Sequence, residues 1–110
     1  MSFSYAFQGI VTFFRTQHNA WIHAVAAAAA IAAGFYFQLG KWDWALVTLA
    51  IAMVFITEML NTAVEFLTDL VSPQFHPLAK KAKDVAAASV LFASVAAIVL
   101  GAIVFLPKFL

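Results

Sequence analysis

Residues 85–106 read VAAASVLFASVAAIVLGAIVFL and contain no charged side chain. A helix needs about 20 consecutive apolar residues to cross a membrane, because the hydrocarbon core is about 30 Å thick and each residue rises about 1.5 Å. The stretch therefore predicts a transmembrane helix.

Two further stretches have the same character. Residues 20–39 carry no formal charge, and residues 44–63 are mostly apolar and carry no charge before Glu58. Over the whole chain 65% of residues are hydrophobic and 10% are charged, whereas soluble domains are nearer half and a quarter. We therefore expect an all-α membrane protein, with residues 1–110 forming one membrane-embedded domain and spans at about 20–39, 43–70 and 83–106.

The first residues predict a helix of another kind, over about residues 2–16. Its large apolar side chains recur at the spacing that places them on one helix face, and polar side chains occupy the other face. The apolar face comprises Phe3, Phe7, Ile10, Val11 and Phe14, and the polar face Ser4, Gln8, Thr12 and Arg15. This pattern predicts an amphipathic helix lying in the membrane interface, or alternatively a helix packed on a partner subunit.

The basic residues predict the orientation of the chain. Arg15 precedes the first span and a lysine cluster, Lys80, Lys81 and Lys83, lies between the second and third, whereas Lys41 and Lys108 are the only bases at the other ends. Basic loops stay in the cytoplasm, so we expect the N-terminus and the 72–84 loop to be cytoplasmic. Because the chain has no cysteine, disulfides and thiolate metal sites are excluded.

A polar stripe follows the apolar part of the second span, in TEMLNTAVEFLTD at residues 57–69. At 100° per residue Glu58, Asn61, Glu65 and Asp69 share one helix face. A carboxylate at membrane depth is expensive and usually marks a functional site. Structural explanations remain for three members: a solvated carboxylate for Asp69, helix–helix hydrogen bonding for Asn61, and pairing of Glu65 with Lys80 or Lys83.

The stripe suits phosphoryl transfer at a membrane surface. One carboxylate can hold Mg²⁺ together with substrate phosphates while another removes a proton. The lysines of KKAKD at residues 80–84 supply positive charge for phosphate oxygens. Neither a GxxxxGK[ST] loop nor a kinase glycine-rich loop is present, so a nucleotide site of another kind is required.

The segment EMLNTAVEFLTDLVSPQFHPLAKKAKDVAAASVL at residues 58–91 resembles the signature of the small bacterial integral-membrane lipid kinases. This family comprises the diacylglycerol kinases and the similar undecaprenol kinases. SYAFQGIVTFFRTQHNAWIH at residues 4–23 is similar to the family's surface helix, so the resemblance covers essentially the whole chain. It implies a homotrimer with intersubunit active sites in the bacterial inner membrane, and ATP and Mg²⁺ as cofactors.

The resemblance also implies residue roles. Glu58 would take the proton from the lipid hydroxyl, beside Asn61, and Lys83 would stabilise the γ-phosphoryl group. Glu65 would bind the metal. Asp69, His76 and Asp84 match positions on the nucleotide side, and Tyr5 matches an aromatic residue near the adenine.

Some positions depart from the family pattern. Gln17 stands where one branch has a second metal-binding glutamate, so a weaker metal site is expected. Ala88 replaces a glycine of the undecaprenol branch, whereas Asn19, His23 and the ending FLPKFL resemble that branch. His18 and His23 do not share a helix face, which argues against a metal pair and favours interfacial hydrogen bonding.

Two other functions fit some of these features. A small channel or proton-coupled transporter would line a path with Glu58, Asn61 and Glu65, but residues 44–55 offer only Thr48 as a polar group at the outer depth. A non-catalytic scaffold would use the carboxylates to hold subunits together, but this leaves the lysine cluster unexplained.

Overall fold

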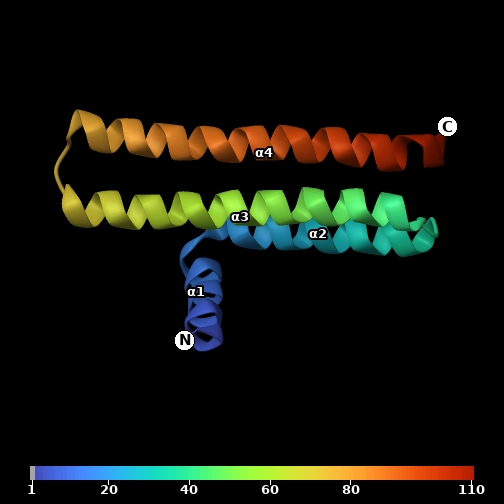
Figure 1. The fold of residues 1–110 in the computed structure, drawn as a ribbon, viewed down its shortest axis with the longest axis horizontal. Helices are drawn as coiled ribbons and strands as arrows, with labels where there is room; N and C mark the ends of the chain where they lie inside the picture. The colour runs from blue at the N-terminus through green and yellow to red at the C-terminus, as the bar shows by residue number, and fades with distance from the viewer. Residues whose placement is uncertain (1) are drawn as a thin grey trace.

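The computed structural model describes residues 2–110, which form four α-helices, α1 (Phe3–Thr16), α2 (His18–Tyr36), α3 (Lys41–Val71) and α4 (Pro77–Phe109) (Figure 1). Helices α2, α3 and α4 are long and apolar enough to cross a membrane. This confirms the prediction of an all-α protein with three candidate spans.

Helix α3 is the central element of the bundle. It packs against α4 along most of its length and against α2 in its first half, and α1 leaves the start of α2 at a steep angle (Figure 1). With 31 residues α3 is about 46 Å long, well above the roughly 30 Å of hydrocarbon. Its C-terminal turns therefore continue past the start of α2, and they carry Glu65 and Asp69.

The tight turn between α2 and α3 is built from backbone hydrogen bonds. Leu39 N donates to Gly34 O at 3.1 Å and Gln38 N donates to Phe35 O at 3.2 Å, while Gln38 has a φ of 54°. These bonds and the left-handed residue form a Schellman motif, in which glycine is the usual residue. The motif reverses the chain in few residues, so α2 and α3 are antiparallel neighbours.

Helix α4 begins at Pro77, before the lysine cluster and before the predicted span at about residue 83. Proline suits the first helical position because its missing N–H would have no intrahelical partner there. His76 caps the helix, since its Nδ1 accepts a hydrogen bond from Leu78 N at 3.1 Å. The lysine cluster therefore lies on the first turns of a helix, which fixes the spacing of its backbone positions.

The buried core of the chain is small and lies at the end that holds the α2–α3 turn. Leu39, Val47 and Val104 are buried there against Phe37 and Trp44. In the most apolar windows of α2, α3 and α4 only 11%, 22% and 11% of residues are buried. Most apolar side chains of the spans thus face outward, where lipid or further subunits can cover them.

Candidate functional site

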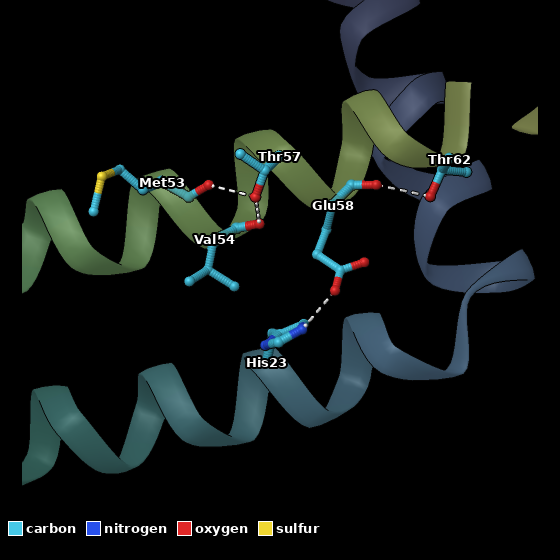
Figure 2. Close-up of polar contacts among 6 residues, drawn as sticks. All are labelled: His23, Met53, Val54, Thr57, Glu58 and Thr62. Carbon is cyan, nitrogen blue, oxygen red and sulfur yellow. Dashed lines mark hydrogen bonds and ion pairs between the residues drawn. The ribbon is translucent and has the colours of Figure 1, made fainter. Parts of the chain in front are cut away.

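The centre of the site is an interhelical contact between Glu58 on α3 and His23 on α2. His23 Nε2 lies 2.9 Å from Glu58 Oε1, and the two side chains are 24% and 9% exposed (Figure 2). Glu58 is the deepest carboxylate of the stripe and is buried, so the site begins inside the helix bundle.

Hydroxyl groups around Glu58 are satisfied by the α3 backbone. Thr62 Oγ1 donates to Glu58 O at 2.9 Å, and Thr57 Oγ1 lies 2.9 Å from Met53 O and 3.1 Å from Val54 O (Figure 2). Such bonds remove the cost of placing a threonine hydroxyl in an apolar helix. The Glu58 carboxylate is therefore available to pair with His23 and with a ligand.

Along α3, the residues of the polar stripe become more exposed from Glu58 towards Asp69. Glu58 is buried, Asn61 and Glu65 are half-buried and Asp69 is exposed. Glu65 follows Glu58 by about 10 Å along the axis, and Glu58 Oε1 is engaged by His23 Nε2 at 2.9 Å. Among residues 2–110 no three Asp, Glu or His side chains form a metal cluster.

The start of α4 brings basic and acidic groups together near the end of α3. Lys83 Nζ lies 2.6 Å from Asp69 Oδ1, and Lys80 Nζ lies 2.6 Å from Asp84 Oδ2. Pairing of Glu65 with Lys80 or Lys83, one of the structural explanations considered, is therefore wrong, because both lysines hold other carboxylates. Lys83 and Asp69 are 41% and 65% exposed, so this pair is weak and can be exchanged for a ligand.

Gln17 lies at the junction of α1 and α2. It has an extended backbone, and its Nε2 donates to Thr16 Oγ1 at 3.3 Å, which leaves its Oε1 available. Because α2 and α3 are antiparallel and His23 faces Glu58, Gln17 lies at about the depth of Glu65 on α3. Tyr5 is exposed on α1, two to three turns before Arg15, and His76 serves as the α4 cap.

An apolar cavity of about 350 Å³ lies among α2, α3 and α4. Alanines of α2 and residues of α3 and α4 line it, and His23 and Ser94 are its polar lining residues. His23 therefore both lines the cavity and holds Glu58, which is not itself a lining residue.

The sequence predicted interfacial hydrogen bonding for His23, whereas the structure pairs this residue with Glu58. A signal for it existed: positions equally far from a tight turn face each other in an antiparallel hairpin. His23 lies 17 residues before Gly40 and Glu58 lies 18 residues after it, and Gly34 and Trp44, which are in contact, lie 6 and 4 residues from the same glycine.

Comparison with known proteins identifies the family. Residues 4–105 match the family model described as prokaryotic diacylglycerol kinase. The chain belongs to this family. It is therefore an enzyme of the diacylglycerol kinase and undecaprenol kinase type, as the resemblance implied.

Individual relatives agree with this assignment. The chain is 42% identical over 97% of its length to the undecaprenol kinase of Bacillus subtilis strain 168, of which the match covers 87%. It is 41% identical over 100% of its length to a diacylglycerol kinase of Synechocystis, but spans only 63% of that protein. The diacylglycerol kinase of Escherichia coli K12 is 29% identical over 73% of the chain and 71% of its own length.

Proposed function

We propose that this protein transfers the γ-phosphoryl group of ATP, with Mg²⁺, to the hydroxyl of a membrane lipid at the cytoplasmic interface. The observation that carries the proposal is the buried carboxylate of Glu58, held by His23, which lines an apolar cavity. A carboxylate buried at this depth can reach the hydroxyl of a lipid that lies in the membrane. A water-soluble acceptor would not enter the helix bundle at this depth.

Glu58 acts as the general base in this proposal. Its Oε2 accepts the hydroxyl proton while the lipid oxygen attacks the γ-phosphorus, and the bond from that phosphorus to the β,γ-bridging oxygen breaks to release ADP. Asn61, one turn further along α3, orders the reacting groups. General-base catalysis contributes about 10²–10⁴-fold to such steps.

The exposed end of the stripe binds the nucleotide. Lys83 leaves Asp69 to neutralise charge on the γ-phosphoryl oxygens, as cations do in phosphoryl transfer. Asp69, His76 and Asp84 face the nucleotide, and Tyr5 is placed against the adenine.

The residues present fit a magnesium ion held mainly by its substrate. Mg²⁺ favours one or two carboxylates together with phosphate oxygens and water, and when bound it neutralises the triphosphate. Glu65 supplies one carboxylate and Gln17 an uncharged amide oxygen at about the same depth. This donor set is consistent with the absence of a cluster of three acidic or histidine ligands among residues 2–110.

Orientation and assembly complete the proposal. The lysine cluster on α4 supports a cytoplasmic location for that end in a bacterium, and the exposure of Phe3, Phe7, Ile10 and Val11 supports a position of α1 in the membrane interface. The outward-facing apolar residues of the spans support packing against further subunits, and in this proposal the subunits form a homotrimer and share each active site.

The transporter alternative is disfavoured by the cavity. A path for ions or protons needs polar groups along its length, but the lining beyond His23 and Ser94 is apolar.

The first experiment follows transfer of labelled γ-phosphate from ATP to diacylglycerol and to undecaprenol, each with purified protein in mixed micelles.

Glu58→Gln should lower the labelling rate by about 10²–10⁴-fold, because the amide keeps the shape but cannot take a proton. Asp43→Asn is the matched control, since Asp43 lies 4.0 Å from Lys108 at the opposite end of the bundle. Labelling of neither lipid by the wild type, or full activity of Glu58→Gln, would refute the proposal.

A further inference from the structure

His23 is a polar side chain that the proposed reaction does not yet use. It lies on α2 between Ile22 and Ala24, in a helix whose other residues are mostly apolar. Its Nε2 lies 2.9 Å from Glu58 Oε1 and its side chain is 24% exposed. The contact joins two helices that otherwise meet through apolar residues and a glycine.

The direction of this hydrogen bond follows from the chemistry of the two groups. An ionised carboxylate only accepts hydrogen bonds, and a neutral imidazole has one N–H and one acceptor nitrogen. A general base must be ionised before it accepts a proton, so in the proposed reaction Nε2 carries the hydrogen and donates to Oε1. The other oxygen, Oε2, is directed away from the imidazole (Figure 2).

The imidazole ring is itself held in place by aromatic side chains. Phe55, one turn before Glu58, meets the His23 ring edge to face at 6.3 Å between centroids. Phe13 and Phe14 of α1 contact Phe55 in turn, at 6.4 and 6.3 Å. Trp21 then joins α2 to α1, because its Nε1 donates to Phe14 O at 2.9 Å.

We propose that His23 is a positioning residue for catalysis, which fixes the Glu58 carboxylate so that Oε2 faces the acceptor hydroxyl. This inference rests on the proposed function. A glutamate side chain has several rotamers. If the Glu58 side chain samples several of them, its free oxygen is less often in a reactive geometry relative to the acceptor hydroxyl. A group that orients a base is a recurring part of such sites, and a misplacement of about 1 Å costs as much as 10²-fold in rate.

The arrangement also explains how a carboxylate is kept at this depth. A buried charge needs a hydrogen-bonding partner, and the His23 N–H supplies one without adding a net charge. Two variants separate orientation from packing. His23→Gln retains an N–H at about the distance of Nε2, whereas His23→Leu fills similar space without a donor.

The experiment measures kcat, and KM for ATP, with the lipid acceptor that the wild type labels. His23→Leu should lower kcat roughly 10–100-fold with KM for ATP unchanged, and His23→Gln should keep most of the activity. His18→Leu is the matched control, because His18 is exposed at the start of the same helix. Added to Glu58→Gln, His23→Leu should cause little further loss, since groups acting as a unit are not additive.

Several results would overturn the inference. Wild-type kcat in His23→Leu would show that the hydrogen bond is unimportant for the rate. Equal losses in His23→Gln and His23→Leu, or losses matched by a lower thermal midpoint in detergent, would show a packing role only. An inactive wild type would instead refute the proposed function itself, so the two failures are distinguishable.

Discussion

Gln17 is the residue at which this chain differs most clearly from a site with two carboxylates for the metal. We predict that Gln17→Glu lowers the magnesium concentration for half-maximal activity by roughly tenfold, because a charged ligand replaces a neutral one. Asn19→Asp is the control, since it adds the same charge near the same helix start. Unchanged magnesium dependence in Gln17→Glu, or an equal shift in Asn19→Asp, would exclude Gln17 from the metal site.

Single residues of the site differ in how well they can be predicted from sequence. Glu58 stands out because a carboxylate in an apolar helix violates the hydropathy pattern, and this is a local property of the chain. The partner of Glu58 is not local: His23 is recognised only when the depth of both residues in the hairpin is known. The pairing of Lys83 with Asp69 likewise depends on where α4 begins, which Pro77 and His76 decide.

At the scale of elements, the close approach of α2 and α3 depends on Gly34. A Cβ built at this position would lie 2.5 Å from Cη2 and 2.9 Å from Cζ2 of Trp44. Gly34→Ala should therefore destabilise the hairpin by about 1–3 kcal/mol through overpacking, although alanine favours helix formation. Gly101→Ala on α4 is the matched control, because no atom lies within 4 Å of its Cβ position.

The measurement for Gly34→Ala is the thermal unfolding midpoint of both variants in the same detergent. A lower midpoint for Gly34→Ala together with an unchanged or higher one for Gly101→Ala would support the prediction. Equal midpoints would mean that the Trp44 ring moves aside at little cost, and that α2 and α3 are held together elsewhere, with the His23–Glu58 contact as the next position to test.

The three spanning helices were predictable from the sequence because each is a long apolar run, and its hydrophobicity is summed over many residues. Helix ends depend on single residues and are less accessible. Gln38 takes the left-handed conformation that usually indicates glycine, and Gly40, the more obvious turn residue, has a φ of −75° instead. The spans expected at about 20–39 and 43–70 put the break at residues 40–42, whereas the backbone reverses at Gln38 and Leu39.

For the whole molecule, the question is whether one chain holds a complete site. Along α3, Asp69 with its partner Lys83 lies about 16 Å from Glu58, so a single chain separates the base from the lysine proposed for the γ-phosphoryl group. If neighbouring subunits of a trimer supply these two groups, Glu58→Gln and Lys83→Met chains should complement each other. Neither variant alone should be active, because each lacks one group at all of its sites.

Mixed in equal amounts and allowed to exchange, the two variants should regain about a quarter of wild-type activity, since a site needs an intact Glu58 from one subunit and an intact Lys83 from its neighbour. Exchange is verified by recovering untagged chains on a tag carried by the other variant. Verified exchange without recovered activity would place Glu58 and Lys83 of each site in the same chain. Because α3 and α4 are joined by the short loop after Val71, that result would require the nucleotide to bridge the distance along a single α3.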